Sequence, residues 1–355
     1  MNDQHDMSEA VGMIRESAAG IADRNDLGRI RKLRYSVPGF DRTTWRDMCE
    51  MGWLALRLPE ESGGIGLGMT ACCALMEELG RALLPEPMIG AMLAVQALDE
   101  AHLPSVISGE KIVLPVWQEA RSSLSVGNSV KFEDGRISGT RQYVAMAAGA
   151  DAFLVAVVNG WVLVEANSPG LSLEIVQTQD GGHYGTLTFD QVPASTISTT
   201  APSVPLAEAA LATAAYLLGS IDETIERTLD YLRTRVQFGK AIGSFQALQH
   251  RMVDLKLEAA LTRASVGDAA RIWDNSAGSA RAHAAVSRAK ARASTTAMRV
   301  TREAIQLHGG IGYTDEHNIG LYLRKAMVMA PAYGDAKFHR QRFAELTKEL
   351  SETAE

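Results

Sequence analysis

The sequence contains few of the residues that mark several classes of protein. Only three of its 355 residues are cysteines, and Cys72 and Cys73 are adjacent, so a disulfide framework is excluded and a reducing compartment is expected. Acidic residues outnumber basic ones by 42 to 35, which gives a formal net charge of −7. This balance argues against a nucleic acid or an anionic membrane as the main partner.

The start of the chain carries no signal for a membrane. Its first residues are polar and acidic, without the basic and then apolar segments of a leader, and we see no run of about 18 apolar residues after them. We therefore expect a cytoplasmic protein that neither crosses nor enters a membrane.

The hydrophobic content of 46% and charged content of 22% are ordinary for a soluble globular protein, and the length allows more than one domain. Apolar spacing predicts helices through residues 1–110, including one over 70–83. A glycine-rich loop at 61–68 precedes that helix. Because no lysine-serine pair follows it, a turn between helices is favoured over phosphate binding.

Short β-rich segments separated by turn dipeptides follow, at 112–117, 129–132, 153–158, 161–164 and 171–175. Asp134-Gly135 and Asn159-Gly160 are strong hairpin signals. Four helical segments then follow, at 206–235, 245–273, 280–307 and 321–350, which favours a bundle. The sequence thus predicts an α+β protein with an N-terminal helical domain (1–110), a middle antiparallel β-domain (111–200) and a C-terminal four-helix bundle (201–355).

The turn at residues 231–246 lies between two long apolar helix faces and carries Arg233 and Arg235. On spacing alone, this is a helix hairpin whose last-turn arginines complement the helix dipole. The order of its residues is more specific: Arg235 begins Arg-x-Gln-Phe-Gly-Lys, and a Phe-Gln pair follows at 245–246. A second segment, Gln-Leu-His-Gly-Gly-Ile-Gly-Tyr-Thr, occupies 306–314.

These two segments, in this order, resemble the C-terminal signatures of the acyl-CoA dehydrogenase family. The resemblance covers most of the chain, including Met51-Gly-Trp, Glu77-Glu-Leu-Gly-Arg and residues 139–158, and it is strongest after Leu206. It implies the same three-part architecture, with the 61–68 loop and the helix after it lining part of an acyl pocket. It also implies FAD-dependent α,β-desaturation of an acyl-CoA thioester, with electrons passed to an acceptor such as an electron-transfer flavoprotein.

The resemblance implies a set of FAD-binding residues. Arg235 matches the arginine that reaches the pyrophosphate of a neighbouring subunit's FAD, for which a guanidinium is well suited. The other matching positions are Phe238 and Gln246, beside the adenosine half, and Gln306, Gly309 and Gly310, on the other side. Such a site implies a homo- or hetero-oligomer, a dimer or a tetramer; a purely structural role is the alternative for these residues. His308 has no second ligand at metal spacing, so we expect a packed or surface histidine.

The middle of the chain departs from the family. The Thr-Glu-Pro and Gly-Ser-Asp segments that hold the flavin ring in other members are missing from residues 115–123. Tyr143 and Ala145 stand where the family has an aromatic and a hydroxyl; Tyr143 can stack on a flavin, but Ala145 cannot donate a hydrogen bond. The ring end of this chain's own flavin site is therefore unmatched.

The catalytic base is unmatched as well. Tyr333 stands at the position of the family's glutamate, and a phenol with an ordinary pKa of about 10 is a poor base at neutral pH. Other members place the base 26 residues before the arginine, which here is Ala209, next to Glu208. Glu208 and Asp335 are the candidates; the alternatives are that Glu208 only favours a helix dipole, or that neither acts.

The resemblance as a whole implies an FAD-dependent acyl-CoA dehydrogenase that acts with a partner subunit. Some bacterial members of the family with polycyclic substrates, such as steroid or bile-acid side-chain CoA esters, pair a full-length subunit with a shorter one that has lost flavin or base residues. This chain resembles the shorter subunit. The alternatives are a non-catalytic subunit that completes another chain's FAD site, and a flavin oxidase or monooxygenase on the same fold.

Overall fold

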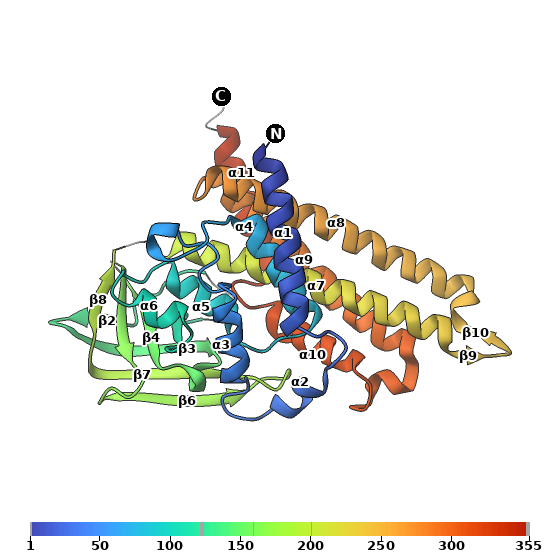
Figure 1. The fold of residues 1–355 in the computed structure, drawn as a ribbon, viewed down its shortest axis with the longest axis horizontal. Coiled ribbons are helices and arrows are strands. Elements are labelled where there is room, and N and C mark those ends of the chain that lie inside the picture. The colour runs from blue at the N-terminus through green and yellow to red at the C-terminus, as the bar shows by residue number, and fades with distance from the viewer. Residues whose placement is uncertain (1, 121–123, 159, 200, 353–355) are drawn as a thin grey trace.

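The computed structural model describes residues 2–120, 124–158, 160–199 and 201–352, with side chains from residue 9 onward. β-structure occupies one end of the molecule, and long helices extend from it to the other end (Figure 1). The predicted α+β class is confirmed. The domain boundaries at residues 110 and 200 stay predictions.

The N-terminal part is helical, as predicted. Its helices are α1 (Asn2–Ile21), α2 (Gly28–Leu33), α3 (Arg42–Glu50), α4 (Met69–Arg81), α5 (Met88–Val95) and α6 (Leu103–Ile107). The glycine-rich loop leads into α4, whose first amides face the carboxylate of Asp274 from the C-terminal bundle. This carboxylate accepts hydrogen bonds from the Thr70 backbone N–H at 3.0 Å and its hydroxyl at 2.6 Å. A protein carboxylate thus occupies the helix end that a phosphate would need, which agrees with a turn.

The middle part contains eight strands among the described residues. They are β1 (Val113–Val116), β2 (Lys131–Glu133), β3 (Arg136–Ala145), β4 (Ala152–Val157), β5 (Gly160–Glu165), β6 (Leu171–Gln177), β7 (His183–Pro193) and β8 (Ser195–Ser198). They form two four-stranded sheets in the orders β1-β4-β5-β8 and β2-β3-β7-β6. The expected purely antiparallel pairing was wrong for one pair, because β1 reaches β4 by a crossover through the other sheet and therefore pairs with it in parallel.

The two sheets pack face to face, and helices cover the outer face of the first. Phe153 and Val155 of β4 join a core with Leu187 of β7, whereas Leu154 and Ala156 face the main helical core. Every residue of β4 is buried for this reason.

Strands β7 and β8 were not predicted. The inward-facing His183, Gly185, Leu187 and Phe189 alternate with more exposed residues, and this alternation is the signal that could have revealed β7. The hairpin predicted at Asp134-Gly135 is confirmed, since both residues have positive φ (49° and 71°) between β2 and β3. Asn159, in the second predicted hairpin, lies outside the described residues.

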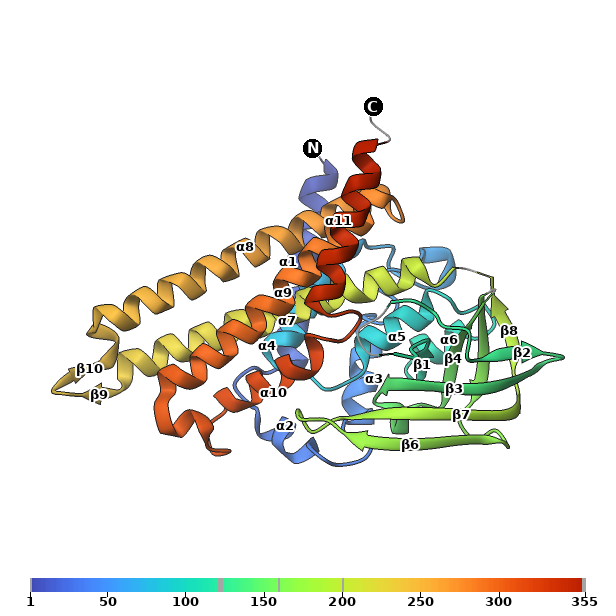
Figure 2. The same ribbon diagram turned by 180° about the vertical axis from the view of Figure 1, so that it is seen from behind.

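The C-terminal bundle contains α7 (Ser203–Thr234), α8 (Gln246–Ser276), α9 (Ala280–His308), α10 (Ile319–Met329) and α11 (Ala336–Glu352). The predicted apolar face of α7 is buried, as its residues Leu218, Ile221 and Ile225 show. Between α7 and α8, the short strands β9 (Val236–Gln237) and β10 (Lys240–Ala241) form a hairpin that projects from the bundle at the end far from the β-sheets (Figures 1 and 2).

The expectation of one continuous helix over residues 321–350 was wrong. The chain leaves the helix after Met329 and begins α11 at Ala336. Pro331 has no N–H to continue the ladder, and Tyr333 and Gly334 have φ values of 53° and 94°. This break, the α10–α11 loop (residues 330–335), carries Tyr333.

By length and composition, α7 is long and apolar enough to span a membrane. The sequence analysis did not identify this segment. In the structure, 94% of its most apolar window is buried by the rest of the protein, as for the core helix of a globular fold.

Candidate functional site

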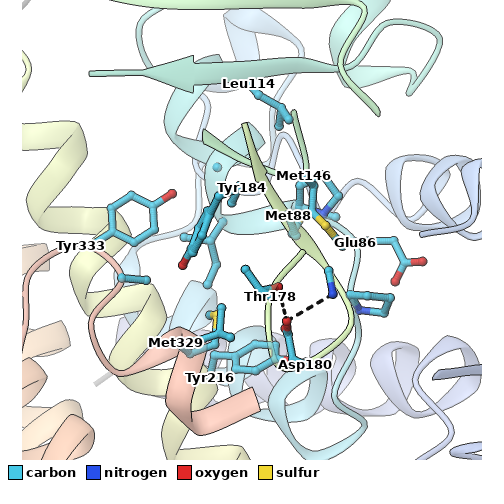
Figure 3. Close-up of a pocket in the computed structure, with 18 of the residues that line it drawn as sticks. Glu86, Met88, Leu114, Met146, Thr178, Asp180, Tyr184, Tyr216, Met329 and Tyr333 are labelled. Atoms are coloured by element: carbon cyan, nitrogen blue, oxygen red, sulfur yellow. Dashed lines mark hydrogen bonds between the residues drawn. The ribbon is translucent and has the colours of Figure 1, made fainter. Parts of the chain in front are cut away.

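A cavity lies between the β-sheets and the helical bundle (Figure 3). Its volume is about 130 Å³, and its lining is mostly apolar. The lining includes Met76 and Leu79 of α4, Met88 of α5, Trp117, Tyr143, Ala145, Tyr184, and Met329 and Tyr333 at the end of α10. Helix α4 therefore contributes to the lining of this cavity, whereas the 61–68 loop does not.

Aromatic side chains fill the middle of the cavity. Trp117 and Tyr333 stack with ring centroids 5.0 Å apart and planes 14° from parallel. Tyr333 points from its loop towards Tyr184, whose ring meets Tyr143 edge-on at 6.2 Å (Figure 3). Two segments predicted to depart from the family thus meet here, and the space expected for a flavin ring holds side chains. Of the segment where the family motif is missing, residues 121–123 lie outside the described residues.

Asp180 is a carboxylate of this cavity that the sequence did not suggest. It forms a buried ion pair with Lys325 of α10 at 2.6 Å and accepts hydrogen bonds from the Thr178 hydroxyl at 2.6 Å and the Gly182 N–H at 3.2 Å (Figure 3). Burial would raise the pKa of Asp180, but the Lys325 ammonium and these hydrogen bonds hold that pKa below its ordinary value. Asp180 is therefore a weak proton acceptor.

Glu86 is the second carboxylate that lines the cavity. Its side chain is completely buried, and its Oε1 accepts from the Arg29 guanidinium and from the Asp41 N–H. These contacts tie the carboxylate to the N-terminal helices, which is a structural role.

His183 and Tyr333 are two further lining groups that could take a proton. His183 Nε2 accepts the Ala148 N–H at 2.9 Å, so its ring presents only an N–H donor, and burial lowers its pKa. Burial raises the pKa of the Tyr333 phenol above its ordinary range. Each carboxylate of the described lining is thus held in an ion pair, although the second oxygen of Glu86, Oε2, has no hydrogen-bond partner. The sequence did not reveal Glu86, Asp180 or His183 because only folding brings these distant segments together.

The predicted base Glu208 lies outside this cavity. It forms an ion pair with Arg57 and accepts the Trp273 indole N–H at 2.8 Å, in a small packing gap between α4, α5, α7 and α8. A carboxylate held by a guanidinium and an indole supports packing, so the geometry does not favour Glu208 as the base.

The other candidate base, Asp335, also lies outside the cavity. Its Oδ1 accepts the Phe338 N–H at 2.7 Å, which caps the start of α11. It lines an open groove along α9 that also contains Arg302, Gln306 and Tyr313.

The predicted FAD-binding residues of the 231–246 turn lie on the surface, far from the cavity. Arg235 is exposed, and Phe238, at the tip of the β9–β10 hairpin, is 89% exposed. Gln246, the first residue of α8, is exposed as well. Within the described residues, neither the Arg235 guanidinium nor the Gln246 amide has a hydrogen-bonding or ion-pair partner.

The second predicted segment lies at the same end of the bundle. The Tyr231 hydroxyl donates to the His308 carbonyl at 3.1 Å, and their rings stack at 4.4 Å, so the end of α7 rests on the end of α9. Gln306, Gly309 and Gly310 are exposed, and a side chain added at either glycine would meet no atom within 4 Å. His308 itself is buried, as a packed histidine, and no group of three or more potential metal ligands occurs in the part of the chain that the structure describes.

The structure thus sorts the predicted residues into two places. Tyr143 lines the cavity, whereas Arg235, Phe238, Gln246, Gln306, Gly309 and Gly310 form what we call the bundle-end surface. Glu208 and Asp335 belong to neither.

Comparisons with known proteins agree with the sequence motifs. Residues 8–110 match the model of the acyl-CoA dehydrogenase N-terminal domain, and residues 200–346 match that of the acyl-CoA dehydrogenase C-terminal domain. The acyl-CoA dehydrogenase IpdE2 of Mycolicibacterium smegmatis is 33% identical over 95% of this chain and 98% of its own length. IpdE2 of Mycobacterium tuberculosis is 33% identical over 88% of this chain and 90% of its own length.

Two solved structures are similar over almost the whole chain. A variant of the Tcur3481-Tcur3483 steroid ACAD has a TM-score of 0.87 and 30% identity, covering 98% of this chain and 99% of its own. The ChsE4-ChsE5 complex from Mycobacterium tuberculosis has a TM-score of 0.84 and 25% identity, covering 97% of each chain.

The chain belongs to the acyl-CoA dehydrogenase family. It is accordingly an acyl-CoA dehydrogenase flavoprotein, and its cofactor is FAD.

The two sites differ in how well they fit that cofactor. The cavity, at about 130 Å³, is smaller than the roughly 300–1,000 Å³ of ordinary ligand pockets, and a Trp117–Tyr333 stack lies in its lining. The bundle-end surface offers an unpaired guanidinium, an exposed aromatic and open backbone at two glycines, which suit a diphosphate and an adenosine.

Proposed function

We propose that this chain is a subunit of an FAD-dependent acyl-CoA dehydrogenase and completes the FAD site of a related partner chain. The observation that carries the proposal is the position of Arg235. Arg235 joins the end of α7 to β9. The β9–β10 hairpin lies at the end of the bundle far from the β-sheets (Figures 1 and 2), so Arg235 cannot reach a flavin held against its own sheets.

The chemistry of the bundle-end surface supports this role. A guanidinium without a protein partner can form two parallel hydrogen bonds to a diphosphate. Phe238 presents a free aromatic face beside it, and the open backbone at Gly309 and Gly310 admits a close neighbour. These groups can bind only a molecule that comes from outside the chain. For the FAD of a partner chain to reach them, the two chains must form an oligomer.

The cavity supports a division of labour in the assembled enzyme. FAD, when bound, supplies the acceptor for the hydride that leaves the substrate's β-carbon. A base must take the α-proton, and the carboxylates Glu86 and Asp180 are both held in ion pairs. We therefore assign the base to the partner chain, and to this chain the positioning of the cofactor's diphosphate.

The relatives suggest what kind of complex this is. The Tcur3481-Tcur3483 protein is a steroid ACAD, and ChsE4-ChsE5 is a complex. By analogy, we propose that the substrate is a polycyclic, steroid-like acyl-CoA ester. We further propose a hetero-oligomer in the cytoplasm, which reduces an acceptor such as an electron-transfer flavoprotein.

The test compares FAD retention after co-purification with a related acyl-CoA dehydrogenase subunit from the same source. The lone chain should be colourless and the complex yellow. Arg235→Ala should weaken FAD binding by roughly 10- to 100-fold, which corresponds to about 1.5–3 kcal/mol for charged hydrogen bonds, and Arg235→Lys should restore part of it.

Arg233→Ala is the matched control, because Arg233 is exposed two residues away but already pairs with Asp230 at 3.4 Å. It should retain FAD as the wild type does. Equal FAD content in the Arg235→Ala and Arg233→Ala complexes would refute the proposed role.

A further inference from the structure

We propose that Trp117 and Tyr333 form a plug that closes this chain's own flavin-ring cavity, and that Lys290 is the positioning residue that holds the plug in place. This inference goes beyond the proposed function, because it concerns residues within one chain and can be tested without a partner.

The plug depends on an unusual backbone path. Tyr333 has a φ of 53°, a left-handed conformation that side-chain-bearing residues rarely adopt. In this conformation, within the α10–α11 loop, the Tyr333 ring lines the cavity and stacks on Trp117. A left-handed residue persists only where surrounding contacts hold it, so the neighbourhood of the loop should contain such contacts.

Lys290 supplies these contacts from the middle of α9. Its side chain is completely buried, and its ammonium donates to the Ala330 carbonyl at 2.8 Å and the Gly334 carbonyl at 3.0 Å. A third hydrogen bond, at 3.0 Å, goes to the Ser294 hydroxyl, which itself donates to the Ala330 carbonyl at 3.0 Å. The two carbonyls bracket Tyr333 on either side.

His339 holds the carbonyl between them. Its Nε2 lies 2.8 Å from the Tyr333 carbonyl and donates to it, while Nδ1 lies 3.3 Å from the Ser287 hydroxyl. The carbonyls of residues 330, 333 and 334 are thus all bound by buried side chains from α9 and α11.

The charge of Lys290 makes this arrangement hard to open. An unpaired buried ammonium is strongly unfavourable, and no carboxylate among the described residues lies within ion-pair distance of it. The positive charge of Lys290 is instead stabilised by carbonyl oxygens of the loop and by the negative end of the α10 helix dipole, since α10 ends at Met329. If the loop moved away, the buried Lys290 Nζ would lose its hydrogen bonds to the Ala330 and Gly334 carbonyls, whether charged or neutral, so Lys290 favours the closed position.

The probe for the plug is lumiflavin, which has the isoalloxazine ring but no ribityl chain or phosphate. It reports on the cavity alone, and its binding to the purified single chain can be followed by fluorescence. The wild type should not bind it measurably. Tyr333→Gly should bind at least tenfold more tightly, because glycine accepts the positive φ and removes the ring, while Tyr333→Phe keeps the stack and should behave as the wild type.

Tight lumiflavin binding by the wild type, or no gain with Tyr333→Gly in a folded chain, would overturn the plug. Arg235→Ala should leave this assay unchanged, so its outcome is separate from that of the proposed function.

The role of Lys290 is tested with Lys290→Met, which removes the charge and all three hydrogen bonds. We expect lumiflavin binding between that of the wild type and Tyr333→Gly, with faster proteolytic cleavage in residues 330–335. Lys337→Met, an exposed lysine just after the same loop, is the control. Should Lys290→Met fail to fold, Ser294→Ala removes one link of the same network and should shift both measurements in the same direction. A folded variant with wild-type binding and cleavage would show that Lys290 does not position the plug.

Discussion

The cavity lacks the family's flavin-ring motifs, whereas the bundle-end surface keeps the family's other cofactor motifs, and the two regions differ in how their polar groups are paired. In the cavity, both carboxylates are paired within the chain: Asp180 with Lys325, and Glu86, through its Oε1, with Arg29. At the bundle end, Arg235 and Gln306 have no side-chain partner among the described residues. Burial demands that polar groups be satisfied internally, whereas an exposed group that is conformationally held but unpaired is available for a ligand.

This difference teaches where function can reside in a chain that has diverged. When stacked aromatic side chains occupy a cavity, they add van der Waals contacts and leave no room for a flavin ring. The residues that line such a cavity then contribute to the stability of the fold. Exposed groups without partners contribute little to the stability of the fold. Binding a second molecule is the physical reason for their presence on the surface.

Trp117→Ala should have the largest effect on the free energy of unfolding, so it is the strongest test of the difference between the cavity and the bundle-end surface. Trp117 is buried against Tyr333, so its removal should lower the free energy of unfolding by about 3–5 kcal/mol, as for other buried large aromatics. Urea denaturation of the lone chain measures this. A loss below about 1 kcal/mol would mean that the cavity is loosely packed rather than filled.

Glu208→Gln separates support of the fold from catalysis. Removing the charge leaves Arg57 buried without its partner, so stability should fall by about 3 kcal/mol, while the amide oxygen can still accept from Trp273. Turnover of the assembled complex per folded molecule should be retained. Abolished turnover with unchanged stability would identify Glu208 as the base after all.

Because Lys290 is buried, we expect the free energy of unfolding to depend on pH. Burial lowers the pKa of Lys290 to about 7 from 10.5, and the nearby Asp335 opposes this only in part. Between these two values the unfolded chain binds the extra proton, so the wild type should gain stability relative to Lys290→Met as the pH rises from 7 towards 10. The neighbouring His339, with its pKa lowered to about 3 by burial, stays neutral throughout.

Denaturation of both proteins at several pH values gives this difference directly. Parallel stability curves for the two proteins would mean that Lys290 titrates as an ordinary lysine.

Phe238→Ala should have the smallest effect on stability and is the counterpart of Trp117→Ala. Because Phe238 is 89% exposed, the free energy of unfolding should change by less than about 0.5 kcal/mol. FAD retention by the complex should nevertheless fall about fivefold, from the loss of one aromatic contact of about 1 kcal/mol. A clear loss of stability with unchanged FAD retention would make the bundle end a structural feature and break the comparison.

Much of the architecture followed from local patterns. The helices of the bundle were predictable from apolar steps such as Leu218, Ile221 and Ile225, and the first hairpin from Asp134-Gly135. Pairing was less predictable: β1 joins β4 in parallel because of a crossover that no local pattern encodes. The break before Tyr333 had a visible signal in Pro331 and Gly334, which the long apolar pattern over residues 321–350 outweighed.

The sequence by itself determined the family and the residues of the bundle-end surface, because those motifs are contiguous and lie at turns, where backbone needs restrict the residue types. Only the tertiary structure decided that Glu208 and Asp335 lie outside the cavity, that Trp117 meets Tyr333, and that Lys290 holds the loop between α10 and α11. Apart from the local cap that Asp335 forms, these contacts join residues 44 to 216 positions apart. Side-chain packing, rather than any local preference, sets which of those residues meet.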